Sequence, residues 1–267
     1  MTQAPDTADR PEAELAAGVT EDAFLGGAVI ARQPQSGYRA GVDAVLLAAS
    51  VAAPSDRPLK VLDLGAGVGV VGLCVARRMD NAIVTLLERE PELAGFARDN
   101  VAINSMAGRV QVVAADLGAP AETLGLKAEA FDHVLANPPF FDPASCRPPR
   151  DPLRASAHVM PVEGLDTWLR VMARLTRPGG IATMIHHADS LADVLAAFDR
   201  RFGAVTVRPI HARADQPALR ILVQGRKGSR GRLQISPPLV LHDQSNAFRP
   251  EIARVLRGPV SLADIAS

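Results

Sequence analysis

The chain has 267 residues, enough for one large or two small domains, and its 48% hydrophobic content can fill a substantial core. Its 29 basic and 29 acidic residues balance, so net charge alone identifies no polyanionic partner. Cys74 and Cys146 form no CxxC or Cys/His pattern, which argues against a zinc site and fits a reducing compartment. The sequence has neither a signal peptide nor an apolar run of about 20 residues, so we expect a cytoplasmic protein without a membrane span or a metal.

The start of the chain is acidic. Residues 1–22 carry six acidic residues against Arg10 alone and hold little to bury, so we predict a disordered acidic tail. We expect ordered structure to begin near Phe24, with residues 23–58 as an N-terminal extension or cap. Residues 59–257 then form the main domain.

From Leu59 onward, short apolar runs alternate with helical stretches. Strands are predicted over 59–64, 82–88, 109–116, 131–137, 180–187, 203–210 and 218–226, the last a candidate for antiparallel pairing. Helices are predicted over 71–79, 91–104 and 191–201. This alternation predicts an α/β fold, a mostly parallel seven-stranded sheet with helices on both faces.

The first predicted strand ends in the glycine-rich run DLGAGVG (63–69) and leads directly into a helix. Such a turn needs residues without a Cβ, both for positive φ angles and for the close approach of a ligand. The helix N-terminus offers unpaired N–H groups to an anionic group. We therefore expect a nucleotide-like ligand here; a tight turn without a ligand is the alternative.

The glycine spacing alone does not separate NAD from S-adenosylmethionine. Gly67, Gly69 and Gly72 satisfy the dinucleotide pattern G-x-G-x-x-G, and Glu88 follows at the distance of a ribose-binding acid. Asp63 favours S-adenosylmethionine, because its carboxylate attracts the positive amino group of a methionine moiety and repels a pyrophosphate. The second feature that favours this cofactor follows the fourth predicted strand.

That feature is the run Asn137-Pro138-Pro139-Phe140, at the carboxyl end of a predicted strand, where open α/β sheets bind ligands. Two prolines stiffen the backbone and remove N–H donors, so that carbonyl groups are left to accept hydrogen bonds. Asn137 adds a side-chain carbonyl and Phe140 a flat apolar face. Together they suit a planar group that bears an NH2; a proline-stiffened turn is the alternative.

The motifs DLGAGVG, LLERE, AAD and ANPPF, in this order, resemble S-adenosylmethionine-dependent methyltransferases that modify exocyclic or amide nitrogens. The chain most resembles the bacterial transfer-RNA adenine-N6 methyltransferase family. The segments SGYRAGVDAVLLAAS (36–50) and RASAH (154–158), with the basic carboxyl-terminal part, extend the resemblance over about 24–257. It implies a Rossmann-like fold and methyl transfer to the exocyclic amine of an RNA base. Of these bases, the resemblance favours adenine, methylated at N6, in transfer RNA.

The resemblance assigns the cofactor contacts residue by residue. Asp63 and the backbone of Gly65 and Gly67 would hold the methionine part of S-adenosylmethionine. Glu88, at the end of the second strand, would accept hydrogen bonds from the ribose hydroxyls. Asp116, at the end of the third, would face the adenine amine of the cofactor. A strand-end cap or a loop charge is the alternative for both acids.

The resemblance also makes Asn137, Pro138, Pro139 and Phe140 the catalytic element. The Asn137 side chain and the Pro138 carbonyl would hold the acceptor amine for direct in-line transfer, without a metal or a strong general base. Phe140 stands where the family often has Tyr and also occurs in ribosomal-RNA guanine-N2 methyltransferases, so guanine N2 is an alternative. Release-factor glutamine methyltransferases share the Asn-Pro-Pro motif, but they usually carry an N-terminal helical domain for which the stretch before Leu59 is too short.

Basic residues gather in two places. Residues 208–232 contain seven Arg or Lys residues opposed only by Asp215, and Arg147, Arg150 and Arg154 follow the Asn-Pro-Pro-Phe run. Acidic residues in the tail and basic residues near the catalytic edge would suit the binding of a phosphate backbone. The alternative is that these basic residues form only a solvated surface. We predict an RNA partner bound through 208–232 and 147–154; the resemblance, not the charge, favours RNA over DNA.

Overall fold

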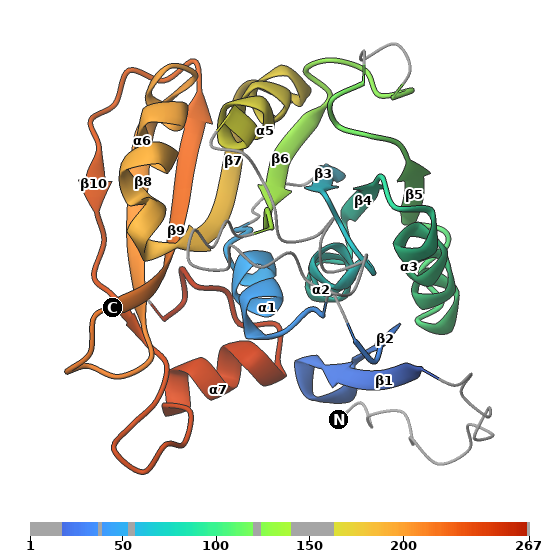
Figure 1. The fold of residues 1–267 in the computed structure, drawn as a ribbon, viewed down its shortest axis with the longest axis horizontal. Helices are drawn as coiled ribbons and strands as arrows, with labels where there is room; N and C mark the ends of the chain where they lie inside the picture. The colour runs from blue at the N-terminus through green and yellow to red at the C-terminus, as the bar shows by residue number, and fades with distance from the viewer. Residues whose placement is uncertain (1–17, 37–38, 53–56, 120–123, 140–162, 266–267) are drawn as a thin grey trace.

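The computed structural model describes residues 18–36, 39–52, 57–119, 124–139 and 163–265, and its centre is a nine-stranded sheet (Figure 1). In sheet order, the strands are β10 (Gln234–Ile235), β8 (Phe202–His211), β9 (Ala218–Lys227), β7 (Thr176–His187), β6 (Phe131–Ala136), β3 (Leu59–Leu64), β4 (Ala82–Glu88) and β5 (Val110–Ala114), with β11 (Leu239–Val240) paired to β8. The seven predicted strands are β3 to β9. The sheet is wider than predicted, because β10 and β11, of two residues each, pair with β8.

Strand direction decides where a ligand can bind. β3 to β7 pair in parallel, and β9 pairs antiparallel with both β7 and β8. The chain passes from β3 outward to β4 and β5 and then crosses to β6 on the other side of β3, so the strand order reverses at β3. In open α/β sheets, ligands bind outside the carboxyl ends of the strands at such a reversal.

Helices cover both faces of the sheet (Figure 1). In the described residues, they are α1 (Val42–Ala49), α2 (Val70–Arg78), α3 (Pro91–Ile103), α5 (Glu163–Leu175), α6 (Leu191–Asp199) and α7 (Pro250–Arg257). One apolar cluster contains Leu73 of α2, and the other contains Phe198 of α6. Successive residues of a strand point to opposite faces, so Val61 joins the first cluster and Leu62 the second. Burial on both faces explains why these parallel strands are nearly continuous apolar runs.

β1 (Val19–Phe24) and β2 (Val29–Pro34) form an antiparallel hairpin, in which β2 lies along α3 and the connecting turn η1 (Leu25–Gly27) packs against α7. The last four residues of the predicted tail, 19–22, lie in β1, where Glu21 pairs with Arg32 at 3.3 Å and Asp22 with Arg39 at 2.8 Å. The prediction of a disordered tail was therefore wrong for residues 19–22, because these carboxylates have cationic partners in and just after β2. Residues 1–17 lie outside the described residues.

The packed structure continues past residue 257, where we predicted the domain to end. Leu262 is buried, and its N–H donates a hydrogen bond to the Ala49 carbonyl at 2.9 Å. Arg78 of α2 donates to the carbonyls of Gly258, at 3.0 Å, and Val260. The predicted boundary was too early because residues 258–264 contain no helix or strand, and so leave no periodic pattern in the sequence.

Within the ranges that the structure describes, no helix has the length and apolar character to cross a membrane. In those same ranges, no group of three or more His, Cys, Asp or Glu side chains could hold a metal ion. Cys74 is a free thiol buried in α2, and Cys146 falls outside the described residues.

α2 lies close to β4 because Gly72 has no side chain. A Cβ at this position would overlap the Leu86 side chain and lie 2.9 Å from Val84 Cγ1. We predict that Gly72→Ala lowers the free energy of unfolding by about 1–3 kcal/mol, since an overpacked interface forces side chains and backbone to shift. Urea denaturation measures the change.

Gly95 of α3 provides the matched control, because a Cβ there would meet no described atom within 4 Å. Gly95→Ala should raise the free energy of unfolding by about 0.5–1 kcal/mol, since Ala has the higher helix propensity. Equal effects of the two substitutions would show that the interface between α2 and β4 has space for a methyl group.

Candidate active site

The sheet register brings three of the predicted site segments to one edge. In β3, β4 and β6, one row of paired residues consists of Leu64, Leu87 and Ala136. The residues that follow this row in the chain are Gly65, Glu88 and Asn137. The structure therefore brings together residues that are up to 72 positions apart (137 − 65) in the sequence.

The glycine loop, residues 65–69, connects β3 to α2. Gly65 and Gly67 adopt φ angles of 69° and 56°, in the left-handed region that favours glycine. The N–H groups of Gly65 and Ala66 donate to the Leu87 carbonyl at 2.8 and 2.9 Å, so β4 supports the loop. A Cβ on Gly65 would overlap the Trp168 ring, and the loop is thus closely approached by a side chain of α5.

Asp63 lies in β3, two residues before this loop, and its exposed fraction is 1%. Its Oδ2 accepts a hydrogen bond from the Gly72 N–H at 3.0 Å, which ties the end of β3 to the first turn of α2. Burial raises the pKa of Asp63 to about 7; the Gly72 hydrogen bond opposes this rise and the nearby Glu88 charge adds to it. The predicted role of Asp63, holding the methionine part of the cofactor, stays a prediction.

Glu88 ends β4 and is also buried. Its Oε2 accepts from the Gly67 N–H at 2.8 Å and its Oε1 from the Glu90 N–H at 2.9 Å. One carboxylate thus joins the glycine loop to the loop that follows β4. Each carboxylate oxygen can accept more than one hydrogen bond, so these contacts are compatible with the predicted contact to ribose hydroxyls.

Asp116 lies farther from the strand end than predicted. β5 ends at Ala114, and Asp116 is an exposed loop residue whose Oδ1 accepts from the Gly118 N–H at 2.8 Å. Its loop is held to the same edge of the sheet by the Ala115 N–H, which donates a hydrogen bond to the Glu88 carbonyl at 3.0 Å. The predicted contact of Asp116 with an adenine amine stays a prediction.

Asn137, Pro138 and Pro139 directly follow β6. The Asn137 Oδ1 atom is buried, and among the described residues it has no hydrogen-bond partner. A buried carbonyl without a donor costs about 1–3 kcal/mol, and such atoms in native proteins call for an explanation, such as a functional role. This oxygen therefore indicates a place for a donor from a ligand. Phe140 lies outside the described residues.

The sequence motifs assign no role to Trp168. Trp168 lies in α5, is buried, and contacts the position of a Gly65 Cβ. Its only signal in the sequence is that it is the single tryptophan of the chain, which does not specify a site.

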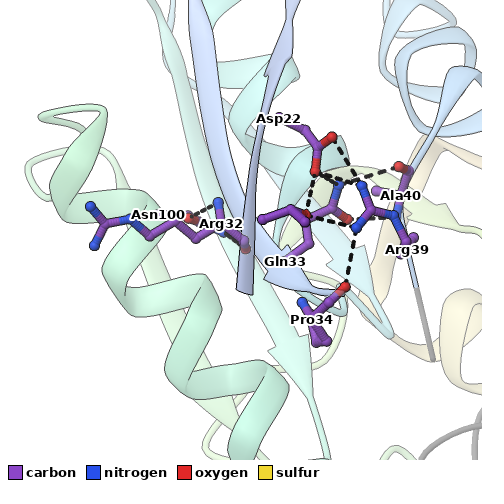
Figure 2. A network of polar contacts seen from close by, with 8 residues as sticks. Asp22, Arg32, Gln33, Pro34, Arg39, Ala40 and Asn100 are labelled. Carbon is purple, nitrogen blue, oxygen red and sulfur yellow. Dashed lines mark hydrogen bonds and ion pairs between the residues drawn. The ribbon is translucent and has the colours of Figure 1, made fainter. Parts of the chain in front are cut away.

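Arg39 and Ala40, which lie just before α1, are held by side chains and backbone of the hairpin (Figure 2). Gln33, fully buried in β2, accepts from the Ala40 N–H at 2.7 Å and donates to Asp22 at 3.1 Å. The guanidinium of Arg39 donates to the same Asp22 carboxylate and to the Pro34 carbonyl. The hairpin thus fixes the chain just before α1 begins.

The basic stretch 208–232 is divided between two edges of the sheet. Arg220 pairs with His187 in register at the carboxyl end of β7, whereas Arg226 pairs with Ile181 in the middle of the strand and Lys227 donates to the Thr176 carbonyl at its amino end. The charges from Arg226 onward therefore lie toward the edge opposite the glycine loop. Our prediction of basic residues beside the catalytic edge was wrong for this half, because β9 runs antiparallel and carries them away.

Several of these cations have partners within the protein. Arg220 pairs with Asp43 at 2.9 Å, and Lys227 pairs with Glu129 at 2.9 Å. Arg208 is half-buried, donates to the Leu262 carbonyl, and has its pKa lowered by burial. The second predicted RNA-binding segment, 147–154, lies outside the described residues.

Residues 41–148 match the methyltransferase small domain. The tRNA1(Val) (adenine(37)-N6)-methyltransferase of Serratia proteamaculans is 31% identical over 189 residues, which cover 69% of this chain and 69% of that protein. Its namesake from Porphyromonas gingivalis is 28% identical over 224 residues, 81% of this chain and 86% of that protein. The chain belongs to the methyltransferase small-domain family. It is an S-adenosylmethionine-dependent methyltransferase, as the motifs predicted.

Solved structures confirm the fold class of this methyltransferase. A predicted O-methyltransferase from Agrobacterium tumefaciens has a TM-score of 0.68 at 34% identity and covers 82% of this chain and 97% of its own. The 16S rRNA N2 G1207 methyltransferase of T. Thermophilus, in complex with AdoMet and guanosine, has a TM-score of 0.53 at 21% identity. It covers 78% of this chain and 50% of its own, and the likeness concerns the fold alone.

The raised pKa of Asp63 makes stability depend on pH. Because the folded-state pKa of about 7 exceeds the usual value of 3.8, protonated Asp63 contributes stability at low pH that is lost as the pH rises through this interval. Asp63→Asn retains an oxygen for the Gly72 N–H and cannot ionise. Between about pH 4 and pH 8, we predict that the wild type loses about 3–4 kcal/mol more stability than the variant, because the pKa shift of about three units contributes about 1.4 kcal/mol per unit.

Urea denaturation at both pH values, on both proteins, measures this difference. Parallel pH profiles for the wild type and Asp63→Asn would mean that Asp63 ionises in the folded protein at its usual pKa.

Proposed function

We propose that this methyltransferase methylates the exocyclic amine of an RNA base, namely adenine N6 in transfer RNA. The observation that carries the proposal is the buried Asn137 Oδ1, which lacks a donor among the described residues and precedes two prolines at the edge of the sheet. An exocyclic amine brings two N–H donors to such a place. An RNA substrate would also fit the expected cytoplasmic location.

The glycine loop and its two carboxylates fit S-adenosylmethionine as the cofactor. Asp63, Gly65, Gly67 and Glu88 are the residues we assign to it, with Asp116 at the adenine end. The positive φ angles leave space for close approach, and the buried acids provide negative charge for a cationic ligand. When bound, S-adenosylmethionine supplies an electrophilic methyl group on a sulfonium.

The chain's own contribution is to hold the acceptor amine. Asn137 Oδ1 and the Pro138 carbonyl would each accept one N–H, which turns the nitrogen lone pair away from the base ring and toward the methyl group. Orientation of this kind can supply about 7–11 kcal/mol of the barrier reduction. The nitrogen gains a methyl group and then releases a proton to water, so no general base is assigned.

The names of the relatives support transfer RNA and adenine, because several are described as tRNA1(Val) (adenine(37)-N6)-methyltransferases. The Agrobacterium protein is described as an O-methyltransferase, but a hydroxyl acceptor brings one donor to a site with two acceptors. Guanine N2 of ribosomal RNA and a release-factor glutamine also present an NH2 and are the alternatives. For RNA contacts, we retain the arginines near the carboxyl edge, such as Arg213 and Arg220.

Asn137→Ala separates the chemistry from cofactor binding. We predict at least a 100-fold loss of methyl transfer, about 2.7 kcal/mol, because the amine loses one acceptor. Affinity for S-adenosylmethionine, measured by calorimetry, should change only a few-fold. Asn137→Asp, which retains an acceptor oxygen at the same place, is the matched variant and should lose less activity. Equal loss of activity and of cofactor affinity in Asn137→Ala would place Asn137 in the cofactor site.

The acceptor can be identified by offering labelled S-adenosylmethionine with unmodified transfer RNA, ribosomal RNA or release factor in parallel. We predict label on N6 of adenine in transfer RNA, since that acceptor combines two N–H donors with a flat ring. Binding of this RNA should weaken steeply between about 50 and 200 mM salt, as phosphate contacts require. Label on guanine would correct the base, and label in the protein alone would refute the RNA substrate.

A further inference from the structure

Two asparagines, Asn100 in α3 and Asn104 directly after it, hold the hairpin strand β2 to the rest of the protein. Asn104 accepts from the Ile30 N–H at 2.9 Å and donates to the Ile30 carbonyl at 2.6 Å. Asn100 accepts from the Arg32 N–H at 2.7 Å and donates to the Arg32 carbonyl at 3.0 Å (Figure 2). The two side-chain amides thus bind alternate residues of β2, as a neighbouring strand would.

The two asparagines differ in their remaining hydrogen bond. Nδ2 of Asn100 also donates to the Val68 carbonyl, in the glycine loop, at 3.0 Å. Nδ2 of Asn104 instead donates to the Asn100 carbonyl, within the polypeptide of α3, at 2.7 Å. Asn100 is fully buried, so this bond to the loop is shielded from competing water.

The Val68 carbonyl lies between two glycines of the loop, where the backbone itself has the most conformational freedom. It is flanked by Gly67 and Gly69, which adopt φ angles of 56° and 90°. Because glycine permits many backbone conformations, the orientation of the intervening peptide must be fixed by hydrogen bonds. Glu88 binds the N–H of Gly67 on one side, and Asn100 binds the Val68 carbonyl on the other.

We propose that Asn100 is a positioning residue for cofactor binding, which orients the Val68 peptide and couples the hairpin strand to the glycine loop. The proposal rests on the assignment of this loop to S-adenosylmethionine. A coupling of this kind is reciprocal: docking of β2 strengthens cofactor binding, and the bound cofactor stabilises docked β2 to the same extent.

Asn100→Ala and Asn104→Ala form a matched pair, because each removes two bonds to β2 and only the first removes the bond to Val68. Calorimetry with S-adenosylhomocysteine should show at least tenfold weaker binding to Asn100→Ala and a change within about threefold for Asn104→Ala. Equal weakening in both variants would reduce Asn100 to a structural residue and overturn the proposal.

Hydrogen exchange of the wild type tests the coupling without any variant, should Asn100→Ala fail to fold. S-adenosylhomocysteine should slow exchange in the peptide that holds the glycine loop and also at the Ile30 and Arg32 amides of β2. Protection of the loop with no change in β2 would overturn the coupling and leave the cofactor site intact. A loop that gains no protection would refute the cofactor assignment itself and this inference with it.

Discussion

The parallel register of β3, β4 and β6 is the constraint on which the site depends. Backbone hydrogen bonds align the carboxyl ends of these strands, and the glycine loop, Glu88 and Asn137 all begin one residue beyond the aligned row. A slip of one residue would send each strand's side chains to the opposite face. Asp63 would then leave Gly72, and the first turn of α2 would lose the acceptor that ties it to β3.

The strand register also decides which charged groups lie at the glycine loop. Two buried carboxylates accept backbone N–H groups at this turn: Glu88 binds Gly67 in the glycine loop, and Asp63 binds Gly72 in the first turn of α2. In a phosphate-binding loop, such N–H groups are left for the ligand. Here protein carboxylates already accept hydrogen bonds from some of these N–H groups. The site therefore suits a cationic cofactor better than a pyrophosphate. The spacing of the glycines alone does not make this distinction between S-adenosylmethionine and NAD.

The sequence was sufficient to predict the helices and strands whose apolar residues recur in a regular pattern. The strands β3 to β9 and the helix that begins at Pro91 were predicted within a few residues, because their buried faces leave a clear pattern of apolar residues in the sequence. The hairpin was not predicted, since its acidic β1 resembles the tail and its stability comes from pairs such as Asp22 with Arg39, which no local pattern encodes.

Prediction from the sequence had similar limits at the candidate active site. Motifs located the glycine loop and Asn137, because those positions require particular residue types. The role of Asn100 depends on a contact with Val68, 32 positions away, and an asparagine in a helix has no distinctive signal. The edge on which Arg226 lies depends on the direction of β9, which a count of charges does not reveal.

The contact between η1 and α7 has a consequence for the order of folding during synthesis. Leu25 lies in η1, and the helix that η1 packs against, residues 250–257, is synthesised more than 200 residues later. Domains generally fold as units while the chain emerges. In this protein the η1 turn cannot complete its packing until α7 has been made, so a nascent chain that stops before residue 250 lacks this contact of η1.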